Sequence, residues 1–146
     1  MALRDLEREA NLVGLAHVFE GLPFPDEAVL DRWEATLADP AVTVLVAGLA
    51  RPCAFTSWDV DGRLRHLGVH PDHWGHGLAR EGVELAVAAI RESGATPTLW
   101  VLLANHRARG LYEHLGWQPT GREQRAEWPP YPPELEMRLP ESGHGR

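Results

Sequence analysis

The segment from Leu67 to Arg80 constrains the fold of this chain more than any other. An apolar run ends at Val69, and Gly75 and Gly77 then open a helix that we expect to extend from about Gly77 to Ser93. In the first turn of such a helix the amide N–H groups lack partners, and the helix dipole adds partial positive charge. The segment therefore predicts an anion site made of backbone, where two glycines admit a phosphate that a Cβ would obstruct.

This motif does not identify its ligand by itself. It is neither the dinucleotide-binding Gly-x-Gly-x-x-Gly nor a P-loop, because no Gly-Lys-Ser/Thr follows. A strand-to-helix turn whose glycines serve only packing explains the same residues. A second segment is needed to decide, and the chain offers one at Leu99–Trp117.

Together, the two segments resemble the GNAT superfamily of acyl-CoA-dependent N-acetyltransferases. The first segment matches the family's Val-x-Pro and glycine-loop pattern at Val69, Pro71, Gly75 and Gly77. The second matches the pattern Asn-x-x-Ala-x-x-Leu-Tyr-Glu-x-x-Gly-Phe/Trp at Asn105, Ala108, Leu111, Tyr112, Glu113, Gly116 and Trp117. The resemblance covers about Leu64 to Leu139.

The resemblance implies an α+β fold (mixed αβα) in one acetyltransferase domain, residues 1–146. Its central mixed sheet would have about six strands, with an antiparallel N-terminal meander, a splayed parallel central pair and about four flanking helices. Relatives usually begin with a strand, whereas only Met1 and Ala2 precede the first expected helix. The sheet lacks that strand, the start is truncated, or a partner chain fills the edge, which would make a homodimer.

Periodicity places the elements. Helical spacing predicts a first helix from Leu3 to near Gly21, and a second one capped by Asp26 that ends before Pro40. The second helix would bury Val29, Leu30, Trp33 and Leu37. Further helices are expected at Gly77–Ser93 and His106–Leu115. Strands are expected at Val42–Gly48, Cys53–Asp59, Arg63–Val69, Leu99–Leu103, Trp117–Arg125 and Glu134–Leu139. Asp61-Gly62 predicts a hairpin, and Trp128–Pro133 indicates a stiff loop or a polyproline ligand.

Acetyl-CoA is the cosubstrate that the resemblance implies. The N–H groups of Trp74 to Arg80 would bind its pyrophosphate, the strand Leu67–Val69 would bind its pantetheine arm, and the Val69 N–H would bond the thioester carbonyl. The predicted cofactor-binding residues are Leu67, Gly68, Val69, Trp74, Gly75, His76, Gly77, Leu78, Ala79, Arg80, Asn105 and Ala108. Asp72 and Trp74 depart from the family pattern. Because backbone makes the site, neither change forbids binding.

Tyr112 is the predicted catalytic acid, since a phenol with a pKa of about 10 is protonated at neutral pH and can donate a proton to the departing thiolate. Its helical spacing with Ala108 and Leu111 also fits simple core packing. Asn105 would bond the cofactor, cap its helix, or do both. The amine would attack the thioester directly, without an acyl-enzyme on Cys53.

The general base is not evident. Relatives often place Glu or His where this chain has Arg63 and Arg65, and arginine cannot accept a proton. Period-two alternation predicts both on the same side as Leu67 and Val69, unless a distortion of the strand re-aims them. If they face the acceptor, they would bind a carboxylate or phosphate on it; the alternative is two surface arginines on a hairpin. Deprotonation would then go through water, Asp59, His66 or Glu127. Phe24 and Trp33 are tentative acceptor-specificity residues, or else ordinary core aromatics.

Composition and charge limit the classes of partner that we expect for this chain. A net charge of −7 without a basic stripe argues against nucleic acid. No apolar run is long enough for a membrane span, and a lone cysteine fits a cytoplasmic protein. The short acidic chain favours a small-molecule primary amine as acceptor.

Two other hypotheses compete with the acetyltransferase prediction. His66, His70, His73 and His76 crowd around the glycine loop and could bind zinc or nickel, although Pro71 and Gly75 interrupt any helix that would align them; we predict no metal site. The alternative is a non-catalytic acyl-CoA-binding sensor, which would keep the cofactor residues and lack a base.

Overall fold

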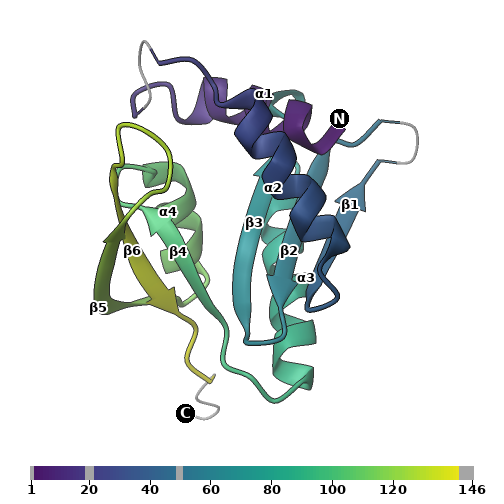
Figure 1. Ribbon diagram of the computed structural model, residues 1–146. Coiled ribbons are helices and arrows are strands. Elements are labelled where there is room, and N and C mark those ends of the chain that lie inside the picture. The colour runs from purple at the N-terminus through teal and green to yellow at the C-terminus, as the bar shows by residue number, and fades with distance from the viewer. Residues whose placement is uncertain (1, 19–21, 49–50, 142–146) are drawn as a thin grey trace.

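A mixed β-sheet between two helical layers forms the centre of the fold (Figure 1). The computed structural model describes residues 2–18, 22–48 and 51–141. In these ranges the helices are α1 (Ala2–Gly14), α2 (Asp26–Ala38), α3 (Leu78–Glu92) and α4 (His106–His114), with a short 3-10 turn at Pro71–His73. The strands are β1 (Val42–Ala47), β2 (Ala54–Asp59), β3 (Arg63–Val69), β4 (Thr98–Leu102), β5 (Gln118–Arg125) and β6 (Pro133–Arg138).

The sheet order is β1-β2-β3-β4-β6-β5. The first three strands form the predicted antiparallel meander. Strands β3 and β4 are parallel, but they pair only at Arg63 with Thr98 and at Leu64 with Leu99. Beyond these pairs the two strands diverge and divide the sheet into two halves (Figure 1). The predicted splayed parallel pair is therefore confirmed.

A bulge changes the side-chain alternation of β3. Ser57 of β2 pairs with His66, and the next residue, Trp58, pairs with Leu64, so Arg65 is the extra residue. As a result Leu64 and Leu67, three positions apart, both pack into the same core cluster. The bulge therefore interrupts the period-two alternation from which Arg63 and Arg65 were expected on the same side as Leu67.

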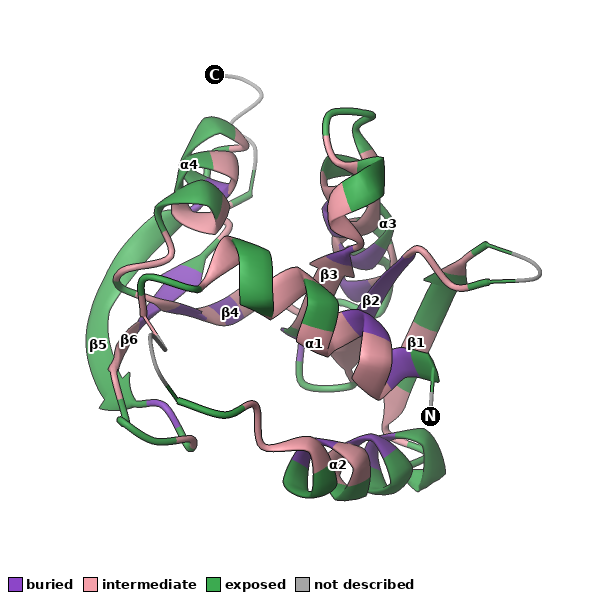
Figure 2. Cartoon of the chain, turned by 90° about the horizontal axis from the view of Figure 1, so that it is seen from above, coloured by how far each residue is buried: buried purple, intermediate pink, exposed green. Residues whose placement is uncertain are grey.

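Helices lie on both faces of the sheet, as the view from above shows (Figure 2), and each face has its own hydrophobic core. On one face, α3 buries Val83, Ala86 and Ile90, which recur at helical spacing. On the other face, α2 buries Val29, Trp33 and Thr36. The predicted inner residue Leu37 is instead 53% exposed and Leu30 is only partly buried, because the spacing through Thr36 turns Leu37 outward.

Two predictions about helix ends are corrected. Helix α1 ends at Gly14, and residues 15–18 form turns; the predicted end, Gly21, lies outside the described residues. Asp26 does not cap α2, because it is the first helical residue and Pro25 holds the cap position. The Asp26 carboxylate accepts a hydrogen bond of 2.8 Å from Arg8 instead.

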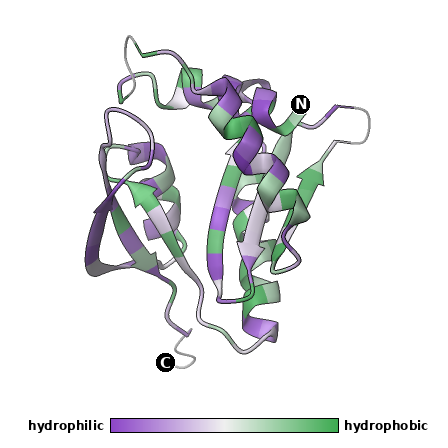
Figure 3. Ribbon diagram, viewed as in Figure 1, coloured by the Kyte–Doolittle hydropathy of each residue, from purple (hydrophilic) through white to green (hydrophobic). Residues whose placement is uncertain are grey.

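The two edges of the sheet differ in character. Strand β5 is exposed at every residue and hydrophilic along its length (Figure 3). At the opposite edge β1 pairs only with β2, and no strand precedes α1 among the described residues. A homodimer through this edge stays a prediction. No helix within the described ranges has the length and apolar content needed to cross a membrane.

Candidate active site

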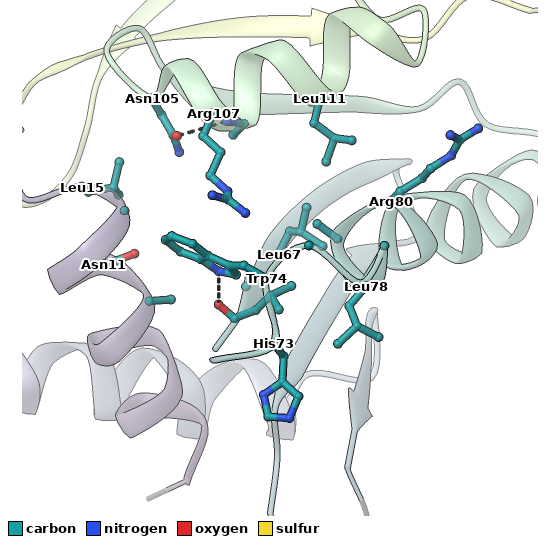
Figure 4. A pocket seen from close by; sticks show the side chains of 18 residues that line it. Asn11, Leu15, Leu67, His73, Trp74, Leu78, Arg80, Asn105, Arg107 and Leu111 are labelled. Carbon is teal, nitrogen blue, oxygen red and sulfur yellow. Dashed lines mark hydrogen bonds between the residues drawn. The ribbon is translucent and has the colours of Figure 1, made fainter. Parts of the chain in front are cut away.

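A cavity of about 380 Å³, here called the α3 cavity, opens where β3 and β4 separate (Figure 4). Strand β3, the glycine loop, the start of α4 and the inner side of α1 line it. All the predicted cofactor-binding residues lie there except His76, which is exposed and lines none of the cavities described here. The lining residues that the sequence did not predict are Ala10, Asn11, Gly14, Leu15, His73, Arg107 and Leu111.

Backbone geometry in the glycine loop fits an anion site. Gly75 and Gly77 have φ values of +85° and +78°, which glycine adopts without strain. A Cβ built on either residue would meet nothing within 4 Å, so the space beside them is open. The first α3 amide with a partner in the described residues is that of Glu81, which donates to the Gly77 carbonyl over 3.0 Å. The N–H groups of residues 78–80 are left for a ligand.

Trp74 closes one side of the α3 cavity. Its indole N–H donates to the Val69 carbonyl over 2.9 Å, and the Arg107 guanidinium lies 3.7 Å from its ring centroid. A Cβ on Gly14 of α1 would lie 3.7 Å from the same ring. Trp74 thus connects the β3 half of the sheet with α4 and α1.

A second cavity of about 250 Å³, here called the inner cavity, adjoins the first and contains Tyr112. The two cavities share Ala10, Asn11, Leu67, Gly68, Asn105 and Ala108. Tyr112 is 6% exposed and packs against Trp117 with ring centroids 5.8 Å apart. Burial raises the pKa of Tyr112 above its ordinary value, so the phenol is protonated at neutral pH.

His66 faces the inner cavity as a neutral imidazole. Its Nδ1 lies 2.7 Å from the Ser57 hydroxyl, and its ring lies 4.8 Å from that of Trp33. Burial, together with the charges of Arg32 and Arg65, lowers the pKa of His66 to about 3. Of the groups predicted as possible bases, His66 lines this cavity, whereas Asp59 and Glu127 do not.

The two arginines predicted to bind the acceptor have different surroundings. Arg65 lines the inner cavity, 4.0 Å from the Asp59 carboxylate. Arg63 does not line it; its guanidinium lies 3.0 Å from the Glu136 carboxylate and over the Trp100 ring. Arg63 therefore joins the two halves of the sheet.

The remaining predicted site residues lie in different parts of the molecule. Trp33 is fully buried, and its indole N–H donates to Glu7 over 2.9 Å, so it is a core residue. Phe24 lines a third cavity beside α1. The Asn105 side chain accepts a bond of 3.2 Å from the Ala108 amide, so it caps α4 while also facing both cavities.

Of the histidines near the loop, His70 and His73 lie side by side with ring centroids 6.2 Å apart, and His66 lies apart from them. His70 pairs with Glu9 over 2.7 Å, whereas His66 contacts Ser57. In the part of the chain that the structure describes, no three His, Cys, Asp or Glu side chains are placed to hold a metal ion.

Comparison with models of known protein families gave a match over most of the chain. Residues 6–117 match the model of the acetyltransferase (GNAT) family. A search of curated proteins found no match. Among solved structures, nourseothricin acetyltransferase is 26% identical, with a TM-score of 0.60 over 70% of this chain and 68% of that one.

Two further structures share the fold over nearly the whole chain. The ribosomal-protein-S18-alanine N-acetyltransferase from Escherichia coli is 19% identical, with a TM-score of 0.67 over 99% of this chain and 90% of that one. The PaiA N-acetyltransferase from Thermoplasma acidophilum, in complex with coenzyme A, is 14% identical, with a TM-score of 0.67 over 92% of this chain and 89% of that one.

Proposed function

This chain belongs to the acetyltransferase (GNAT) family, whose cosubstrate is acetyl-CoA, and we propose that it acetylates the primary amine of a small molecule. One observation carries the proposal: the α3 cavity and the inner cavity adjoin at the divergence of β3 and β4. A thioester held along β3 in the first cavity would meet an acceptor and Tyr112 in the second.

In this proposal, backbone groups make most of the hydrogen bonds to the cosubstrate. The free N–H groups of residues 78–80 would bind the pyrophosphate, and each bond to a charged oxygen contributes about 1.5–3 kcal/mol. Leu67 to Val69 would bond the amides of the pantetheine arm, and the Val69 N–H would bond the thioester carbonyl. Arg80 and Arg107 line the same cavity and add positive charge.

The proposed transfer needs no acyl-enzyme. A neutral amine attacks the thioester carbon, the new C–N bond forms, and the C–S bond breaks to release the thiolate. Tyr112 donates its proton to that thiolate, and the proton lost by the attacking nitrogen restores the phenol through water. The raised pKa of Tyr112 keeps the phenol protonated between turnovers.

Water is the proposed base that removes a proton from the ammonium form of the acceptor before it attacks. His66, with a pKa lowered to about 3, is too weak a base to remove a proton from an alkyl ammonium of pKa about 10. His66 would instead orient the acceptor as a neutral hydrogen-bonding group. Arg65 would bind a carboxylate or phosphate where the acceptor carries one.

A small-molecule acceptor is supported by the limited size of the inner cavity and by the chain's net charge of −7. The similar structures include one protein named for nourseothricin and one named for an alanine of ribosomal protein S18, so their names do not decide between the classes. A non-catalytic acyl-CoA-binding module is the second candidate. It is favoured by the weak basicity of His66 and by the engagement of Glu7 with Arg32 and Trp33.

The test is an acetylation assay with small primary amines and, in parallel, with short peptides. Thiol release and the acetylated product, identified by mass spectrometry, are measured together. We expect small amines to be acetylated and Tyr112→Phe to reduce kcat by about 100-fold or more while acetyl-CoA binding persists. Acetylation of peptides alone would refute the small-molecule acceptor. Acetyl-CoA binding without any turnover would establish the non-catalytic module.

A further inference from the structure

We infer that the acceptor amine carries a bulky apolar group, aryl-alkyl or branched alkyl, which a third cavity binds. This inference rests on the proposed function and specifies its substrate class. The cavity, here called the apolar cavity, has a volume of about 570 Å³. It lies between the end of α1, the segment that leads into α2 and the loop between β5 and β6.

The lining of the apolar cavity is hydrocarbon and aromatic. Among the residues that line it are Leu12, Leu15, Leu22, Phe24, Val29 and Trp128. Its volume lies within the range of small-molecule sites, about 300–1,000 Å³. Leu12 is 59% exposed and Leu22 is 43% exposed, so the chain leaves large apolar side chains uncovered at this site. An apolar ligand would remove that surface from water.

The apolar cavity shares lining residues of α1 with the proposed reaction site. Asn11 of α1 lines the α3 cavity, the inner cavity and the apolar cavity. Glu7, one turn earlier, lines the inner and apolar cavities, and Leu15, one turn later, lines the α3 and apolar cavities. An amine whose nitrogen lies beside the thioester can therefore extend its body past α1 into the apolar cavity.

The charge of Glu7, which lines both the inner cavity and the apolar cavity, is not available to bind the acceptor. Glu7 is the acidic residue that lines the apolar cavity, and one of its carboxylate oxygens accepts bonds from Arg32 and from the Trp33 indole. Its negative charge is thus already paired. The recognition that remains for the acceptor body is burial of apolar surface, with Asn11 as a polar contact at the entrance.

The test compares 2-phenylethylamine with ethanolamine, two small primary amines that differ in apolar surface. Binding to the protein saturated with desulfo-CoA is measured by calorimetry, and acetylation is followed by thiol release from acetyl-CoA. We expect 2-phenylethylamine to bind about 10- to 100-fold more tightly, as burial of one aromatic ring predicts.

Two variants at neighbouring positions test whether the amine binds in the apolar cavity. Leu12→Asp puts a charge on the apolar cavity and should reduce the affinity for 2-phenylethylamine about tenfold. Val13→Asp is the matched control, because Val13 is 57% exposed on the same helix and does not line the cavity. It should retain the wild-type preference. Thermal unfolding of both variants shows that they remain folded.

The outcomes separate this inference from the proposed function. Equal affinity for the two amines, absence of 2-phenylethylamine binding, or equal effects of Leu12→Asp and Val13→Asp would overturn the inference. Acetylation of ethanolamine in preference would also overturn it, while the proposed function would stand. Preferential binding of 2-phenylethylamine without acetylation would support the apolar site and refute the proposed enzyme.

Discussion

Replacing His66 should change how the stability of this protein depends on pH. In the folded chain the imidazole contacts Ser57 and the Trp33 ring, and its pKa is lowered from 6.5 to about 3, first by burial and then by the charges of Arg32 and Arg65. Because the folded-state pKa is depressed, the folded chain holds this histidine neutral. The unfolded chain takes up a proton as the pH falls below 6.5.

The magnitude follows from this difference. Stability from the neutral imidazole is fully present above the unfolded pKa of 6.5 and is lost by about 1.4 kcal/mol per pH unit as the pH falls towards 3. Between pH 7.5 and pH 5, the free energy of unfolding should therefore fall by about 2 kcal/mol through His66 alone. His66→Gln removes this titration.

The assay is urea unfolding of the wild type and His66→Gln at both pH values, with the free energy of unfolding extrapolated to water. The stability difference between the two proteins should shrink by about 2 kcal/mol on acidification. His114→Gln, at an exposed position of α4, controls for the loss of an imidazole and should follow the wild type. A wild-type-like pH dependence of His66→Gln would refute the buried, neutral state of His66.

Three further predictions follow from the same site. Gly68→Ala should lower the free energy of unfolding by about 1–3 kcal/mol, because its Cβ would lie 2.5 Å from the Phe55 ring. Gly110→Ala is the control and should not lower it, because a Cβ there meets open space. Equal shifts of the two variants in thermal unfolding would contradict this. With 2-phenylethylamine, kcat/KM should rise tenfold per pH unit from pH 6 to about 9, since water takes the amine proton; a plateau near pH 7 would reveal a protein base. Arg65→Ala should raise KM about 10- to 150-fold for phenylalanine but not for 2-phenylethylamine, as expected for one charge-assisted hydrogen bond. Equal KM changes would exclude a carboxylate contact.

Local patterns predicted most of the architecture because they act within a few residues. The turn at Asp61-Gly62 led directly into β3, and the helix expected at Gly77–Ser93 is α3. The glycine loop was predictable because left-handed φ values at Gly75 and Gly77 demand that residue type.

Features set by tertiary pairing were not predictable. The bulge at Arg65 depends on how β3 aligns with Ser57 and Trp58 of β2, and it interrupts the alternation from which the side of Arg65 was expected. The contribution of α1 to the cavities depends on how that helix packs, so Asn11 gave no local signal. Arg107 offered one: a cation in the first turn of a helix opposes the helix dipole, which hints at another partner, here the Trp74 ring.

The most direct test of the cofactor site is calorimetric titration of acetyl-CoA into the wild type, Gly77→Glu and Gly121→Glu. Both glycines have left-handed φ values and open space, but Gly77 lines the α3 cavity, whereas Gly121 lies in β5, outside it. If the α3 amides bind the pyrophosphate, binding should weaken by about 100-fold or more in Gly77→Glu, from loss of two or more charge-assisted bonds, and persist in Gly121→Glu. Equal affinity of all three proteins would contradict the proposed site.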